Sequence, residues 1–236
     1  TRVSDFRNTD TTDFYAATST DARTSYKQTG VVTPYAGVVY DLNDIWSVYS
    51  SYTKIYRPQN SKDADRKLLD AIEGDTYEAG LKAAFFDGRL NASFAAFRIE
   101  QDNVAQYVSG FESDSIYRPI AGATTKGFEV ELAGEVLDGW NVSAGYTYQH
   151  TRDANDDYVY SSVLQTTTPQ QVVRLFNTYR LPGALDKVTL GAGVNWQSEF
   201  FGNVFQPNPN DPVNFGQYAR ITQDSYSLVD LMARYR

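Results

Sequence analysis

Four short turns divide the chain at nearly regular intervals. They lie at residues 41–44, 86–89, 136–139 and 182–186. They recur roughly every 45 to 50 residues, and each is flanked by alternating apolar and polar residues, the pattern of paired antiparallel strands. Between and after the turns lie long polar segments, at residues 58–74, 101–125, 152–168 and 198–224. Hairpins that are tight at one end and long-looped at the other are typical of outer-membrane β-barrels.

The strand patterns have two distinct faces, because successive side chains on a strand point to opposite sides. In residues 139–149 and 188–197 one face is apolar and aromatic, and the other carries Asn, Ser, Thr, Gln and Gly. We expect the apolar set on the convex surface: Trp140, Val142, Tyr146, Leu190, Val194 and Trp196. We expect the polar set on the concave surface: Asn141, Thr147, Thr189 and Asn195.

Composition agrees with strands that face lipid on one side and water on the other. The mean hydropathy is -0.46, and no run approaches the roughly 18 apolar residues of a membrane helix. Aromatic residues make up 14% of the chain, with 18 Tyr, and Tyr and Trp favour membrane interfaces. The expected strands of about 10 to 14 residues are long for a soluble β-sandwich, the main alternative. The expected fold class is therefore all-β, an antiparallel transmembrane β-barrel.

The two ends of the chain suggest a part of something longer. Residues 1–5 lack the basic and apolar regions of a signal peptide. The turn spacing puts the next bend just past residue 236. We expect about nine full strands, with residues 1–7 fitting the tail of a further one. Nine strands cannot close a wide barrel, so both sheet edges would be open.

Several motifs along the chain carry a family resemblance. They are EAGLK at 78–82, FFDGRLN at 85–91, GFEVE at 127–131, TYRLPG at 178–183, GAGVNWQ at 191–197 and LVDLMARY at 228–235. These motifs resemble the barrel of TonB-dependent siderophore receptors over nearly the whole chain. The last three are similar to the subgroup that takes up ferric pyoverdine and ferric hydroxamates.

The resemblance implies a 22-stranded barrel closed by an N-terminal plug domain. It implies that a ferric siderophore binds above the plug and that TonB supplies the energy for uptake across the outer membrane of a Gram-negative bacterium. Residues 1–236 would then be the C-terminal part of the barrel domain, without the plug, the TonB box or the terminal strands. The implied partners are the ferric siderophore, TonB and outer-membrane lipid. A passive porin or adhesin barrel is the alternative.

No enzyme is expected, because His150 is the only histidine and no Cys is present. The net charge of -8 argues against a nucleic-acid partner. No cofactor is expected, since iron would arrive already bound to the siderophore. A chelate needs aromatic rings for its own rings and Arg or polar groups for its oxygens. The candidate ligand-binding residues are Tyr107, Phe111, Tyr117, Arg118, Tyr158 and Tyr160.

Overall fold

The main element of the structure is one curved antiparallel sheet. The structure is a computed structural model that describes residues 1–12, 22–109, 115–120, 122–153, 168–207 and 216–236. In this part of the chain nine strands pair in the order β15-β12-β11-β10-β9-β6-β5-β4-β3. Their bounds are β3 (Tyr35–Asp41), β4 (Trp46–Arg57), β5 (Ile72–Phe85), β6 (Leu90–Asp102), β9 (Ala123–Leu137), β10 (Trp140–Arg152), β11 (Gln171–Arg180), β12 (Val188–Gln197) and β15 (Tyr226–Tyr235).

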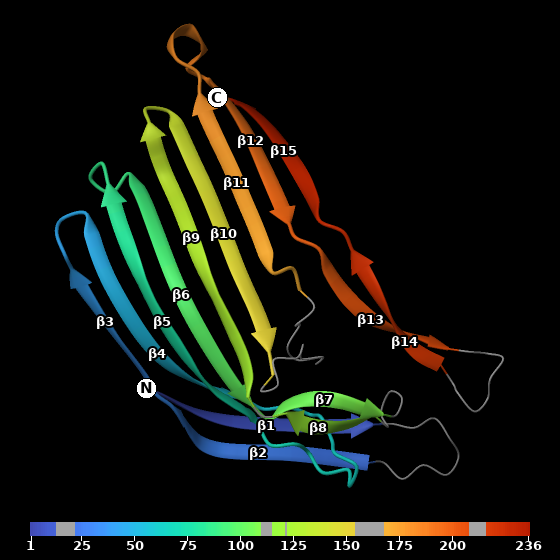
Figure 1. Ribbon diagram of the computed structural model, residues 1–236. Helices are drawn as coiled ribbons and strands as arrows, with labels where there is room; N and C mark the ends of the chain where they lie inside the picture. Colours follow the sequence, from blue (N-terminus) through green and yellow to red (C-terminus); the bar gives the residue numbers. More distant parts are fainter. Residues whose placement is uncertain (13–21, 110–114, 121, 154–167, 208–215) are drawn as a thin grey trace.

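The four short turns lie at one end of this sheet, as the sequence predicts. They join β3 to β4, β5 to β6, β9 to β10 and β11 to β12, and Figure 1 shows all four at its upper end. Gly139 takes a φ of 76° and Gly183 a φ of 65°, a left-handed conformation that glycine adopts without steric cost. The last turn contains a single 3₁₀ turn at Gly183–Leu185. The predicted alternation of short turns and long connections is confirmed.

The opposite end carries three two-stranded hairpins (Figure 1). These are β1 (Arg2–Thr12) with β2 (Ala22–Thr33), β7 (Val104–Ser109) with β8 (Ile116–Ile120), and β13 (Phe200–Pro207) with β14 (Gly216–Gln223). The description of 101–125 and 198–224 as polar loops was therefore wrong. Among the described residues, Val104, Tyr107, Phe201 and Ile221 are of the β-branched and aromatic types that favour strands. Residues 2–7 belong to β1, which pairs with β2 outside the nine-stranded sheet.

The pairing register separates the two faces as predicted. One row across eight strands is entirely apolar or aromatic: Tyr40, Val48, Leu81, Phe94, Val130, Tyr146, Val173 and Trp196. The adjacent row on the other face is mostly polar: Ser47, Lys82, Ser93, Glu131, Gly145, Arg174 and Asn195. The register puts the six residues expected on the convex side together, and the four expected on the concave side on the opposite face.

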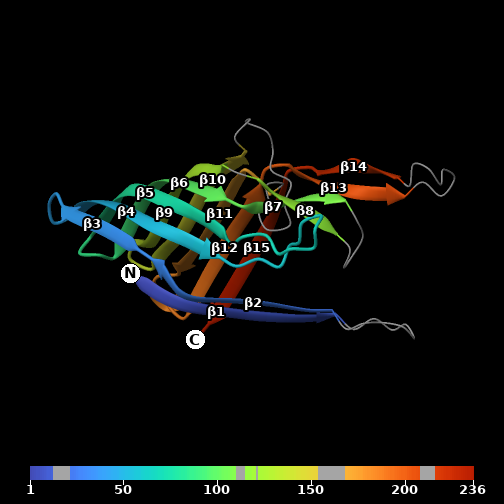
Figure 2. The ribbon, with the colours of Figure 1, turned by 90° about the horizontal axis from the view of Figure 1, so that it is seen from below.

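The polar face is the concave one. A hollow of about 740 Å³ lies on it near the turn end, lined in part by Ser47, Lys82, Asn91, Ser93 and Glu131. The sheet curves from β3 round to β15, as Figure 2 shows from the loop end. Large apolar side chains on the other face are open, for example Leu231 at 83% and Val229 at 67% exposed. A folded sheet with its apolar side outward requires a nonpolar surrounding.

Aromatic residues bound the apolar outer face at both ends. Trp46, Phe85, Trp140 and Tyr179 lie near the turns, and Tyr52, Tyr77, Tyr148 and Trp196 lie toward the hairpins. On β10 this apolar belt covers residues 140–148, close to the ~9–11 residues with which a tilted strand crosses a bilayer. Aromatic girdles of this kind mark the two membrane interfaces of outer-membrane barrels.

Candidate functional site

A cluster of buried apolar residues lies at the base of the β7–β8 hairpin. Ile72, Val104 and Ala123 are almost completely buried there, and Ile120 packs against them. Asn103 links β6 to β7 with a φ of 60°, a left-handed conformation that Asn tolerates better than most residues. Its amide Nδ2 donates a 3.1 Å hydrogen bond to the carbonyl of Ala71. The chain thereby turns sharply from the sheet into the hairpin.

Hydrogen bonds to backbone carbonyls connect the segment 58–71 to the base of the hairpin. Gln59 is 7% exposed, and its Nε2 donates to the carbonyls of Asp70 and Asn103, the latter at 2.7 Å. The backbone N–H of Tyr117 donates to the carbonyl of Lys62 at 2.8 Å. The segment and the hairpin therefore form one packed unit at the loop end.

Two of the predicted ligand residues meet across the hairpin. Tyr107 of β7 is opposite Tyr117 of β8, and their ring centroids lie 6.0 Å apart in an edge-to-face arrangement. Tyr107 is 38% exposed, so the pair presents aromatic surface to solvent. This edge-to-face geometry is favourable for two aromatic rings, and each ring limits the movement of the other.

Arg118 lies on the other face of the hairpin. It follows Tyr117 directly on β8, and neighbouring residues on a strand point to opposite sides. Its Nε donates a 2.8 Å hydrogen bond to Oε1 of Gln106, its cross-strand partner. The predicted ligand residues Tyr117 and Arg118 therefore lie on opposite faces of the hairpin.

The other three predicted residues, Phe111, Tyr158 and Tyr160, lie outside the described residues.

The β13–β14 hairpin contributes a further aromatic contact. The guanidinium of Arg220 lies 3.4 Å from the ring centroid of Phe201, which is 8% exposed. This cation–π contact holds the two strands of that hairpin together at its base.

Sequence reasoning missed a tyrosine cluster at the loop end of β4 and β5. The hydroxyl of Tyr52 donates to Asp75 at 2.6 Å, and its ring lies 5.5 Å from that of Tyr77. Tyr56 packs on Phe6 at 5.4 Å and donates to the side chain of Gln28. The sequence signal was Tyr52 and Tyr56, which a period of two places on the same face of β4, with Tyr77 of β5 opposite Tyr52.

Charged side chains on the concave face contact polar and aromatic neighbours. Glu131 accepts a 3.4 Å hydrogen bond from Ser93, and Glu129 accepts one of the same length from Thr147. The ammonium of Lys82 lies 4.9 Å from the ring centroid of Tyr49.

The described residues contain no group of three or more His, Cys, Asp or Glu side chains that could hold a metal ion. They also contain no helix with the length and hydropathy to cross a membrane.

Comparison with known proteins identifies the class of barrel. Residues 1–236 match the family model described as TonB dependent receptor-like, beta-barrel. The chain therefore belongs to the TonB-dependent receptor family, whose members are β-barrels of the Gram-negative outer membrane.

Two individual relatives are similar to most of this chain. The chain is 46% identical over 212 residues to the ferric-pyoverdine 358 receptor of Pseudomonas putida, covering 88% of this chain and 24% of that protein. It is 42% identical over 218 residues to the ferripyoverdine receptor of Pseudomonas aeruginosa, covering 89% and 25%. The chain thus spans about a quarter of the length of these relatives. Both relatives are receptors for a ferric pyoverdine.

Two solved structures share the fold. The crystal structure of the ferripyoverdine receptor of the Pseudomonas aeruginosa outer membrane, bound to ferripyoverdine, superposes with a TM-score of 0.77 at 39% identity, covering 92% of this chain and 28% of that chain. The alcaligin outer-membrane receptor of Bordetella pertussis gives a TM-score of 0.63 at 33% identity, covering 90% and 38%. The open nine-stranded sheet therefore corresponds to only part of a barrel.

Proposed function

We propose that this chain is part of an outer-membrane receptor that takes up a ferric siderophore, with energy delivered through TonB. One observation carries the proposal: the chain matches the family's barrel along its whole length, and four relatives at 40–46% identity are ferric-pyoverdine receptors. A chelate of the pyoverdine class is the proposed ligand. Iron enters as part of that ligand, and the protein is no enzyme and needs no cofactor of its own.

The other parts of the receptor would lie in the portion of the relatives' sequences that this chain does not span. That portion would hold the remaining strands, the plug domain and the segment that binds TonB. The apolar belt would contact outer-membrane lipid, and no nucleic acid is a partner. The concave charges, among them Glu129, Glu131 and Arg174, would face the plug across a wet lumen.

Within this receptor, the Tyr107–Tyr117 pair is the proposed ligand contact. Its rings lie at the loop end, are partly exposed and are held in place by each other and by the Lys62 carbonyl. Flat aromatic groups of a siderophore would stack on them. Arg118, whose side chain binds Gln106 on the other face, would then stabilise the hairpin rather than bind the same ligand.

Growth tests the receptor function. A strain lacking the full-length gene should fail to grow on one ferric pyoverdine under iron starvation and should grow on unrelated ferric siderophores. Returning the gene should restore growth. Growth of the deletion strain on every chelate in the panel would refute the uptake role.

Binding tests the ligand contact. In the full-length receptor, Tyr117→Ala should raise the dissociation constant for the cognate ferric pyoverdine by about 2- to 10-fold, the value of roughly 0.5–1.5 kcal/mol for an aromatic contact. Arg118→Ala should change it less. Heat-dependent mobility on gels controls for folding. If Tyr107→Ala and Tyr117→Ala both bind as the wild type does, the hairpin is not a contact.

A further inference from the structure

Three basic side chains lie next to each other on the outer face of the sheet, just beyond the apolar belt. Arg98 of β6 is opposite Lys126 of β9, and Lys126 is opposite His150 of β10. We call these three residues the basic row. Because cross-strand partners point to the same side, the row shares its face with Phe94, Val130 and Tyr146.

The row carries more positive charge than nearby residues neutralise. Like charges directly opposite each other destabilise a sheet, and Arg98 and Lys126 are such a pair. Arg98 forms an ion pair with Glu100. Lys126 is exposed and makes no ion pair with any described residue. The Nδ1 atom of His150 is buried without a hydrogen-bond partner in the described part of the chain.

The remaining charges on this part of the outer face already have partners. Asp75 accepts the hydroxyl of Tyr52 at 2.6 Å, and Glu73 lies 3.7 Å from Lys54. Arg152, two residues beyond His150 on β10, donates to the carbonyl of Thr151. Each of these acidic side chains already has another partner, so Lys126 has no counter-charge among the described residues.

The level of the row matches the edge of the membrane. On β10 the outward residues from Trp140 to Tyr148 are apolar or aromatic, and the next is His150. On β9 the outward residue Phe128 is followed, toward the hairpins, by Lys126, and on β6 Ala96 is followed by Arg98. All three strands change from apolar to basic at the same height, where lipid headgroups begin.

We propose that the basic row binds the anionic phosphate headgroup of a lipid in the leaflet at the hairpin end of the barrel. The guanidinium of Arg98 and the ammonium of Lys126 donate to the phosphate oxygens, since charge-assisted hydrogen bonds to phosphate are strong. The imidazole of His150 supplies a third polar contact. Phe128 and Tyr148, whose rings lie 5.7 Å apart, pack against the acyl chain below. The site depends on the membrane barrel and not on which siderophore the receptor takes up.

The preference of the receptor for an anionic over a zwitterionic lipid tests this site. Full-length receptor in detergent is incubated with equal amounts of phosphatidylglycerol and phosphatidylcholine, and native mass spectrometry gives the ratio of the two bound lipids. Lys126→Gln should lower the preference for phosphatidylglycerol on the order of fivefold, the effect of one cation near a membrane surface. Lys126→Arg should keep it. Lys54→Gln is the matched control, because it removes a cation on the same face that already pairs with Glu73.

Two outcomes overturn the proposal. Equal lipid ratios in Lys126→Gln and wild type, in samples that bind the ferric siderophore normally, would show that the row holds no lipid. Inorganic phosphate should displace phosphatidylglycerol no better than chloride at the same ionic strength. Phosphate-specific displacement would reassign the row to a free anion.

Discussion

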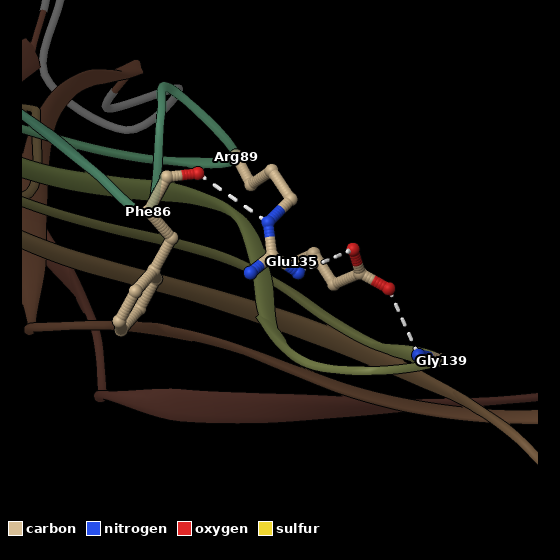
Figure 3. Close-up of polar contacts among 4 residues, drawn as sticks. All are labelled: Phe86, Arg89, Glu135 and Gly139. Atoms are coloured by element: carbon tan, nitrogen blue, oxygen red, sulfur yellow. Dashed lines mark hydrogen bonds and ion pairs between the residues drawn. The ribbon is translucent and has the colours of Figure 1, made fainter.

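The guanidinium of Arg89 lies 3.4 Å from the carboxylate of Glu135 and so joins two neighbouring short turns. Figure 3 shows that Arg89 also donates through Nε to the carbonyl of Phe86, while Glu135 accepts the backbone N–H of Gly139 at 2.9 Å. The backbone N–H of Glu135 donates to the carbonyl of Arg89, which puts Glu135 level with the β5–β6 turn, and its partner on β10 is Asn141, at the turn-side edge of the apolar belt. The four residues hold adjacent hairpins in register.

Acid should weaken this link between the turns. The backbone N–H of Gly139, followed by the side chain of Arg89, lowers the pKa of Glu135. A carboxyl whose folded pKa is depressed contributes stability above its unfolded pKa, and the contribution is lost as the pH falls through the folded pKa. The wild type should therefore resist heat better than Glu135→Gln at pH 7. The difference should begin to shrink near about pH 4, the usual pKa of an unfolded Glu, and should vanish only below the depressed folded pKa. Heat-dependent gel mobility of the full-length receptor measures it.

Asp138→Asn is the control for the acid effect. Asp138 lies exposed in the same turn and has the same charge, but it makes no ion pair with any described residue. Its replacement should leave the pH dependence of unfolding unchanged. A difference between wild type and Glu135→Gln that persists at low pH would contradict the role of the carboxylate charge.

The outward face of β9 predicts where a charge can be tolerated. Leu132 lies in the middle of the apolar belt between Ala92 and Ala144, and Leu137 lies at the turn end, 62% exposed. Leu132→Arg should destabilise the full-length barrel in lipid vesicles by about 2–4 kcal/mol, because a cation at the bilayer midplane is costly. Leu137→Arg should cost about 0–1 kcal/mol. Denaturant unfolding gives both values, and equal costs would mean that the belt is not centred on Leu132.

Alternation in the sequence was enough to predict the sheet but not the contacts at its loop end. Trp140 and Asn141 were assigned to opposite faces from the period of two, and the register agrees. Gln59 and Asn103 were not recognised, because their hydrogen bond joins residues 44 positions apart and amide groups of this kind carry no local pattern. The β7–β8 hairpin was missed because its register shifts between Tyr107 and Ser109, which interrupts the alternation.

Two glycines on the concave face should respond differently to the same substitution. A Cβ at Gly80 would lie under 3.0 Å from the carbonyl oxygen of Phe94 and from the ring of Tyr49, whereas a Cβ at Gly145 would meet nothing within 4 Å. The carbonyl belongs to a paired strand and cannot move away cheaply. Gly80→Val should cost about 1–3 kcal/mol in denaturant unfolding. Gly145→Val should be neutral or slightly stabilising, since Val favours strands. Equal losses would contradict the close approach at Gly80.

The amide of Gln59 should control how firmly the β7–β8 hairpin is held. Gln59→Ala removes the donor shared by the partly buried carbonyls of Asp70 and Asn103, and leaving such carbonyls without a partner costs up to about 1–3 kcal/mol. Hydrogen exchange in residues 58–71 and 104–109 should then accelerate by roughly 5- to 150-fold where local opening limits exchange, while β4 and β5 keep their protection. Lys67→Ala, which shortens an exposed side chain of the same segment, should change nothing. If exchange accelerates throughout the sheet instead, Gln59 supports the barrel as a whole; if it accelerates nowhere, the contact does not hold the hairpin.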